Sequence, residues 1–205
     1  YNEFNEQTLT YDTDGNSNTK NIVKSIYDHY GRLEVQLSYS DLAKARSNNN
    51  PDDISGPEDI SGDSVISGSF YEYDADGRLS TKHTAVDYAA SAVSWSLEKY
   101  DYDDYGRKTK VTVDPAEENV STTYEYNYQG EVTKVTRPDG SSTTTRRNGR
   151  GLVSEVINSK STNSSTTKYY YDLNGNLTKK EDPEGVCDFY MYDSFDRKTI
   201  HRRGK

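Results

Sequence analysis

The chain has 205 residues, a net charge of −9 and 31% hydrophobic residues, a balance that would by itself indicate disorder. The acidic excess argues against binding to nucleic acid, and no apolar run is long enough for membrane insertion. The single cysteine, Cys187, excludes an internal disulfide and a cysteine-based zinc site, and we expect it to be a small buried apolar residue.

The tyrosine content indicates an ordered chain instead. The chain has 19 tyrosines, and each can bury about 150–250 Å² while its hydroxyl keeps a partner. These tyrosines anchor a unit whose clearest copies are residues 27–33, YDHYGRL, and 73–79, YDADGRL. Residues 147–153 form a degenerate copy without the tyrosine. The anchors are Tyr11, Tyr27, Tyr73, Tyr102, Tyr126, Tyr171 and Tyr192, and the matching glycines are Gly15, Gly31, Gly77, Gly106, Gly130, Gly151 and Gly175.

The copies predict turns in chain order. The turns lie in residues 11–16, 27–33, 73–79, 102–107, 126–132, 147–153, 171–177 and 192–197. From residue 102 onward, counting the degenerate copy at residue 147, the copies begin alternately 24 and 21 residues apart, a period that indicates a repeat architecture in which neighbouring units stack. We therefore expect one continuous domain over residues 1–205, built from about eight repeats.

Each unit reads as a β-hairpin. In residues 121–137, Tyr124 and Tyr126 share one strand face, and Val132 and Val135 carry the apolar character of the returning strand. Between them, an Asn at the first turn position and a Gly at the fourth are typical of a type I turn whose glycine takes φ > 0. A second turn closes the unit at residues 114–117, 137–140 and 182–185. Two turns per unit predict a long antiparallel meander sheet that curls into part of a spiral shell or an open barrel-like strip.

One interval breaks the period. Residues 44–64 combine Asn, Ser, Gly, Pro and Asp with almost no aromatic content, and we expect them to form a mobile insertion. The simplest interpretation is a solvated connection between two strands. The alternative is a lid or contact element on the face of the sheet.

A search for chemistry finds no catalytic motif. His29, His83 and His201 are not at metal-ligand spacing, and no nucleophile elbow, zinc-protease motif or phosphate-binding loop occurs. Residues 12–16 resemble the start of a calcium loop, but a calcium loop needs Gly and Glu where the chain has Ser17 and Val23. We expect no enzyme activity, no cofactor and no metal site.

Sugar binding remains open as an alternative. Aromatic side chains on a sheet face could stack on a glycan, although the repeat positions favour packing of the tyrosines across strands. Trp95 is the aromatic residue that the repeat explains least, so it is the candidate ligand contact.

The unit resembles the YD repeat of Rhs and wall-associated proteins. The match rests on Tyr-x-Tyr-Asp-x-x-Gly-Arg-Leu at residues 71–79, a similar run at 26–33, and the Pro-Asp-Gly and Asp-Pro-x-Gly turns, and it covers residues 11–197. The resemblance implies a β-sheet strip that spirals into a hollow shell. In bacterial Rhs toxins and related toxin-complex subunits such shells enclose a toxic polypeptide, and in teneurins they belong to adhesion proteins.

The resemblance implies a structural role. We expect a non-catalytic scaffolding segment of a large secreted or cell-surface protein, of bacterial type, that encloses or presents a polypeptide such as a toxin. The expected partners are the rest of the parent chain or the enclosed polypeptide, with self-association through unpaired edge strands. The alternative is a carbohydrate-binding or adhesion module that uses its exposed aromatic residues.

Overall fold

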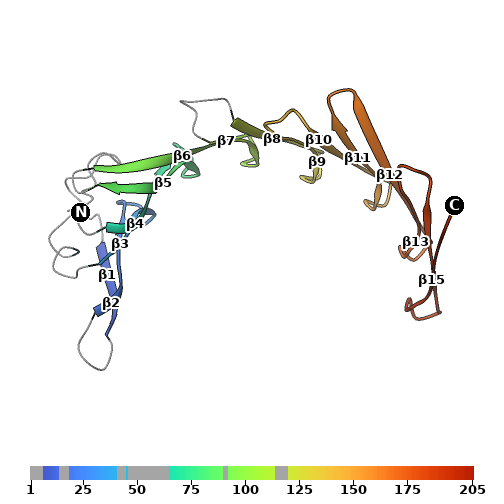
Figure 1. Ribbon diagram of the computed structural model, residues 1–205, viewed down its shortest axis with the longest axis horizontal. Coiled ribbons are helices and arrows are strands. Elements are labelled where there is room, and N and C mark those ends of the chain that lie inside the picture. The colour runs from blue at the N-terminus through green and yellow to red at the C-terminus, as the bar shows by residue number, and fades with distance from the viewer. Residues whose placement is uncertain (1–6, 14–18, 41–44, 46–64, 90–91, 114–119) are drawn as a thin grey trace. The chain divides into compact units, whose positions relative to one another are not determined.

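The computed structural model describes residues 7–13, 19–40, 45, 65–89, 92–113 and 120–205. Within these residues the chain forms 15 strands that pair in sequence order as one antiparallel meander, which confirms the predicted all-β fold (Figure 1). The sheet is not closed, because β1 and β15 have no described partner on their outer edges. The strands are β1 (Gln7–Thr13), β2 (Thr19–Tyr27), β3 (Leu33–Tyr39), β4 (Val65–Tyr73), β5 (Leu79–Ala89), β6 (Ala92–Tyr102), β7 (Lys108–Val113), β8 (Val120–Tyr126), β9 (Val132–Thr136), β10 (Ser142–Arg147), β11 (Val153–Lys160), β12 (Asn163–Tyr171), β13 (Leu177–Glu181), β14 (Cys187–Tyr192) and β15 (Lys198–Gly204).

The chain divides into two compact units. The first comprises Tyr1–Tyr102 and Val111–Val120, and the second comprises Asp103–Lys110 and Ser121–Lys205. The predicted insertion at residues 44–64 lies outside the described residues, except for Ala45, which is buried in the first unit. The mobility of residues 44–64 and the curling of the sheet stay predictions.

The core of the first unit lies on one face of β2, β3 and β4. Side chains alternate across a strand, so Val35, Leu37 and Tyr39 point to the same face of β3, and all three are buried. They pack with Ile26 on β2 and Phe70 on β4. Gly68, on β4, leaves room for this packing, because a Cβ there would lie 2.6 Å from Leu37 Cδ2.

The second unit has a much thinner core. Among its described apolar residues only Cys187 is buried, as expected for a small apolar residue, while most other strand side chains are half-buried. Strand pairing and polar contacts must therefore supply a larger share of its stability than in the first unit.

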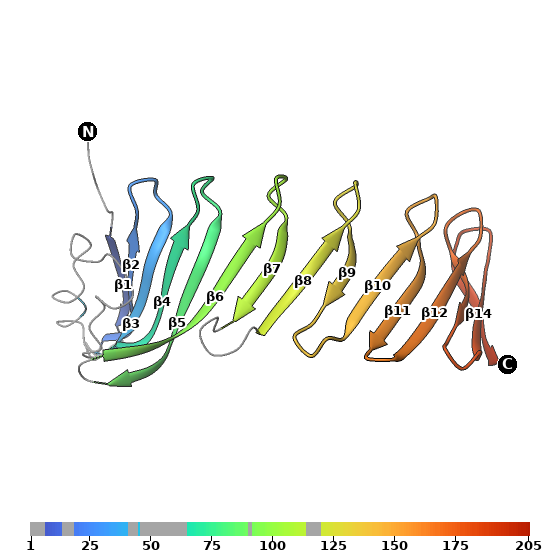
Figure 2. The ribbon, with the colours of Figure 1, turned by 90° about the horizontal axis from the view of Figure 1, so that it is seen from above.

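The seven described turns of the repeat lie at the same end of the strands that they join. They join β2 to β3, β4 to β5, β6 to β7, β8 to β9, β10 to β11, β12 to β13 and β14 to β15, as Figure 2 shows within each unit. Because strand direction alternates, the connection after Tyr11 lies at the opposite end from the turn after Tyr27. Gly15, in that connection, lies outside the described residues.

Candidate functional site at the hairpin junctions

Each turn is organised by the acidic or amide side chain that opens it. In the first described turn, Asp28 Oδ1 accepts hydrogen bonds from the backbone N–H groups of Tyr30 and Arg32, both at 2.9 Å. Asp28 Oδ2 accepts from Arg32 Nε at 2.7 Å, and the Gly31 N–H donates to the Asp28 carbonyl. The turn thus needs a side-chain acceptor at its first residue, a backbone with φ > 0 at its fourth residue and a backbone N–H donor at its fifth residue.

The same contacts recur along the chain. Backbone N–H groups donate to the first side chain in the turns that Asp74, Asp103, Asn127, Asn148, Asp172 and Asp193 open. The prediction of φ > 0 is confirmed at Gly31, Gly77, Gly106, Gly130 and Gly175, and Gly151 adopts it as well. In the last turn, Asp196 takes the glycine position with φ 58°. Asp tolerates this conformation better than most residues because its short polar side chain bonds locally.

The turn geometry lowers the pKa of these carboxyl groups. Partial burial raises the pKa of Asp28 and Asp103, but hydrogen bonds from the backbone and side chains of Arg32 and Arg107 outweigh it, so the net pKa falls. In the last turn, the backbone N–H of Arg197 is the main cause of the lowered pKa of Asp193. These carboxylates are charged turn acceptors, and their environment does not favour a protonated acid.

At four junctions a tyrosine from the following hairpin bonds the hairpin before it. The Tyr73 hydroxyl donates to the Leu33 carbonyl at 2.7 Å, and the Arg32 guanidinium lies 4.4 Å from the centre of the Tyr73 ring. A cation over an aromatic face is attracted by the ring quadrupole. The hydroxyl bond repeats from Tyr102 to Leu79, from Tyr126 to Lys108 and from Tyr192 to Leu177, and the stacking repeats for Arg78 over Tyr102 and Arg107 over Tyr126.

In the degenerate repeat, both the fifth turn residue and the anchor that follows it are changed. Arg147 stands in place of the anchor tyrosine, and Glu131 stands in place of the arginine of the preceding turn. Arg147 Nε pairs with Glu131 Oε2 at 3.0 Å. A pair of opposite charges thus replaces the cation over the ring, so the fifth turn residue and the next anchor act as a matched pair.

A further repeat position was not predicted from the sequence. The ladder shifts register by one residue at the anchor positions 27, 73, 126, 147, 171 and 192, which is the mark of a β-bulge. Beside four of these bulges, a hydroxyl donates to the carbonyl that precedes the anchor: Thr133 to Glu125, Ser154 to Arg146, Thr178 to Tyr170 and Thr199 to Met191. The signal was a Ser or Thr three residues after the turn's fourth position.

No junction bond is described for the three remaining anchor tyrosines. Tyr27 and Tyr171 end β2 and β12 and are half-buried, whereas the side chain of Tyr11 lies outside the described part of the protein. Trp95, on β6, packs beside the core of the first unit, and its Nε1 has no hydrogen-bond partner among the described residues. Its role as a ligand contact stays a prediction.

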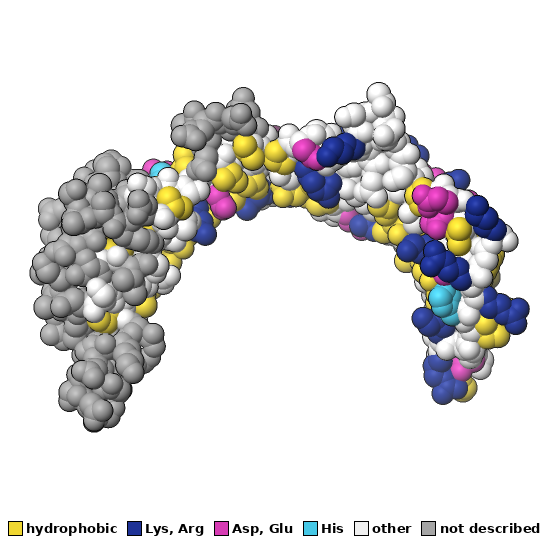
Figure 3. Space-filling view, viewed as in Figure 1, with side chains coloured by type: hydrophobic (Ala, Val, Ile, Leu, Met, Phe, Trp, Pro, Cys, Tyr) yellow, Lys and Arg dark blue, Asp and Glu magenta, His cyan; other side chains and the backbone are white. Residues whose placement is uncertain are grey.

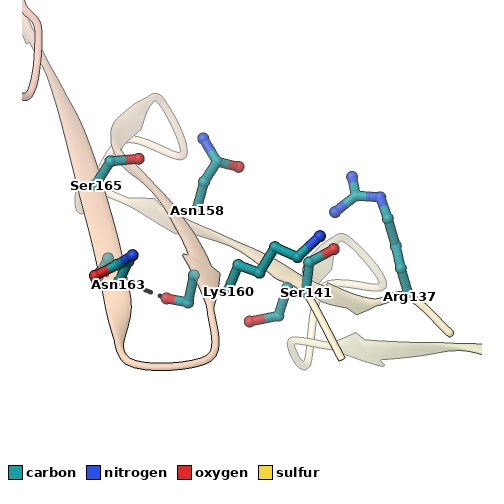
Figure 4. A pocket seen from close by; sticks show the side chains of 9 residues that line it. Arg137, Ser141, Asn158, Lys160, Asn163 and Ser165 are labelled. Carbon is teal, nitrogen blue, oxygen red and sulfur yellow. Dashed lines mark hydrogen bonds between the residues drawn. The ribbon is translucent and has the colours of Figure 1, made fainter. Parts of the chain in front are cut away.

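The second unit contains several open pockets among its described residues, and one of them, of about 310 Å³, is lined by polar side chains alone. Figure 4 shows Arg137, Ser141, Asn158, Lys160, Asn163 and Ser165 around it, and no aromatic side chain lines it. Lys160 is paired with Asp139 at 2.9 Å, and Arg137 donates to Thr143. This pocket therefore lacks the aromatic platform that the sugar-binding alternative expects, whereas another pocket, of about 430 Å³, is lined by Tyr169, Tyr170 and Tyr171.

Two other kinds of site were sought within the described residues. No group of three His, Cys, Asp or Glu side chains could hold a metal ion there. No helix among the described residues is long and apolar enough to cross a membrane.

Comparison with known proteins identifies the fold. The chain matches no family model and no curated protein sequence. It resembles one chain in the crystal structure of TcdB2-TccC3-Cdc42, with a TM-score of 0.58 and 12% identity over 95% of this chain. It also resembles a chain of the Tc holotoxin pore of Photorhabdus luminescens with a mutated TccC3, with a TM-score of 0.57 and 13% identity over 94% of this chain.

These similarities are limited in extent. The matched region is 12% of the first of those chains and 11% of the second. At such identities the likeness concerns the fold. The β-sheet strip of this protein is therefore similar to a segment of much longer toxin-complex chains.

Proposed function

We propose that this protein is a non-catalytic structural segment of a large secreted or cell-surface protein of the YD-repeat type. In that protein it would form part of the wall of a shell or fibre that encloses or presents a polypeptide such as a toxin. The rest of the parent chain and the enclosed polypeptide are the proposed partners.

The observation that carries this proposal is the use made of the repeat residues. The Asp, Gly, Arg and Tyr of the motif are engaged in turns and junctions between hairpins, with bonds such as Tyr73 to Leu33 and Tyr102 to Leu79. Residues engaged in this way hold a sheet together, which is a structural role that needs no reactive group. The similarity to toxin-complex chains supports the same role.

The proposal is tested in the longer protein that contains this segment. Replacing Tyr102 and Tyr126 together by Phe removes two junction bonds of 2.7 and 2.6 Å and keeps both rings. We expect an enclosed polypeptide to become more accessible to protease in this variant. The matched control replaces Tyr105 and Tyr128 by Phe. Both are exposed turn tyrosines, so this change should leave the protection of the enclosed polypeptide from protease unchanged.

Two outcomes would contradict the proposal. One is a protein that encloses no protected polypeptide, and the other is protection that persists after residues 1–205 are deleted. Tight binding of a defined oligosaccharide on a glycan array would instead favour the carbohydrate-binding alternative.

A further inference from the structure

Neighbouring hairpins stop pairing before they reach the turns of the repeat. At five junctions the last paired residue lies three positions before the anchor, as Phe70 lies before Tyr73 and Phe189 lies before Tyr192. The ladders of β5–β6, β9–β10 and β11–β12 stop at the same distance from their anchors. Beyond this point the two strand ends leave a wedge, made of the three residues up to the anchor and the first two residues of the facing strand. A contact other than the ladder must close each wedge.

A tyrosine hydroxyl closes three of these wedges. Tyr73 donates to the Leu33 carbonyl and Tyr192 donates to the Leu177 carbonyl, each from across the wedge, and Tyr102 makes the same bond at its own junction. The hydroxyl and the carbonyl are both uncharged groups, so dissolved salt should affect this closure little.

The wedge between β9 and β10 is closed by charge instead. Arg147 Nε lies 3.0 Å from Glu131 Oε2 across it, and the two side chains are 29% and 34% exposed. Asn127 Nδ2 donates to the same carboxylate oxygen at 2.9 Å, which holds Glu131 in the orientation that Arg147 needs. A pair that is still this accessible to water is weakened when salt screens its charges.

Little apolar contact supports this wedge. β10 has the sequence STTTRR, which contains no apolar residue, and it pairs with β9 at three positions. An open pocket of about 440 Å³ lies between the two hairpins, and residues of both line it, among them Thr133 and Thr145. Figure 3 shows mainly uncharged polar side chains over the neighbouring β11 and β12. Once the ion pair is lost, little buried apolar area opposes separation of the two strand ends.

We propose that Glu131 and Arg147 form an electrostatic latch, at which the sheet of the second unit opens first when ionic strength rises. Opening separates β9 from β10 and leaves the hairpins β8–β9 and β10–β11 intact, because each hairpin keeps its own ladder. The inference goes beyond the scaffold role, since it assigns the sheet a defined place to part and does not depend on any enclosed polypeptide.

Hydrogen exchange of the 205-residue protein, followed by mass spectrometry, tests the latch. The reporters are the backbone amides of residues 132–136 and 142–147. The internal reference is the β13–β14 ladder, which also has three pairs but is closed by Tyr192. Between about 0.01 M and about 1 M salt the Debye length falls from about 30 to about 3 Å. We expect exchange at the reporters, relative to the reference, to become about two- to fivefold faster, the factor that one partly exposed ion pair supplies.

Two variants of the latch separate its charge from its position. Arg147→Gln removes the ion pair, so exchange at the reporters should be fast at both salt concentrations. The double variant Glu131→Arg, Arg147→Tyr rebuilds the contact that Arg107 and Tyr126 make at their own junction. This variant should exchange slowly and should lose most of the response to salt.

The matched control is Arg146→Gln, which removes the same charge from the neighbouring residue. Arg146 pairs with Glu155 at 3.0 Å within its own hairpin, so that bond does not cross the wedge. The control should therefore keep the salt response of the unmodified protein.

Three results would overturn the inference. They are an equal salt response in the β9–β10 and β13–β14 ladders, a salt response that persists in Arg147→Gln, and a double variant that responds to salt as the unmodified protein does. Each of them concerns local opening of the sheet and leaves protease protection in the longer protein unaffected. Failure of the latch is therefore distinct from failure of the scaffold proposal.

Discussion

Removing the hydroxyl of Tyr102 tests whether the junctions stabilise the array. Tyr102→Phe deletes the 2.7 Å bond to the Leu79 carbonyl but keeps the ring beneath Arg78. One net hydrogen bond contributes about 0.5–1.5 kcal/mol. Since Tyr102 is only half-buried, water can reach the carbonyl and no large desolvation penalty is added. We expect the free energy of unfolding to fall by about 1 kcal/mol.

Trp95 makes this prediction measurable in the unit that contains the change. It is the only tryptophan of the chain and lies on the same strand as Tyr102, so its fluorescence reports urea unfolding of the first unit. With a urea dependence of about 2 kcal/mol per M, the midpoint should fall by about 0.5 M. The control is Tyr30→Phe, whose side chain is exposed in a turn of the same unit. Equal midpoints for the two variants would refute the structural role of the junction.

The remaining predictions concern the turns, the core and pH. Gly130→Val should destabilise by more than about 1 kcal/mol, because Gly130 has φ 86°, and an unchanged urea midpoint would contradict the turn assignment. Gly68→Ala should lower the free energy of unfolding by about 1–3 kcal/mol, because its Cβ would lie 2.6 Å from Leu37 Cδ2. The double variant with Leu37→Ala should lose less stability than the sum of the two single changes. The pKa of Asp28 and of Asp103 is lower in the folded than in the unfolded chain, so the folded state binds these protons less tightly. Their contribution to stability is thus present above about pH 4 and is lost as the pH falls through the folded pKa. Urea midpoints that rise on acidification below about pH 4 would contradict this contribution.

The hairpins were predictable because their signals are local. Asn127 and Gly130 determine a turn within four residues, and alternation fixes the strands on either side. The junctions were not predictable in this way, because Arg107 and Tyr126 meet only when two hairpins are aligned in register. The Ser and Thr bonds at the bulges lie within single hairpins, and they were missed because they depend on a one-residue register shift that the turn pattern does not specify.

The spacing of the anchors indicated at which end of the strands each turn lies, which composition does not show. Tyr11 precedes Tyr27 by 16 residues, whereas the copies from residue 102 onward begin 21 or 24 residues apart, and the shorter interval spans one strand instead of two. This is why the two motifs lie at opposite ends of the strands. The surplus of tyrosine indicated order correctly, but only the register shows that its hydroxyls bond the preceding hairpin.

The junction bonds give the array a direction. At the four junctions bonded by a tyrosine hydroxyl, the tyrosine reaches back to the hairpin made before it, as Tyr126 reaches Lys108 and Tyr192 reaches Leu177. During synthesis a hairpin such as the one that carries Arg107 therefore emerges with its arginine uncovered and the Lys108 carbonyl unbonded, and it is completed only when the next strand leaves the ribosome. We expect such a sheet to assemble vectorially from its N-terminal side, with a single growing edge at any moment. Interruption of synthesis would then leave an adhesive end, which makes the growing edge the most vulnerable part of the nascent chain.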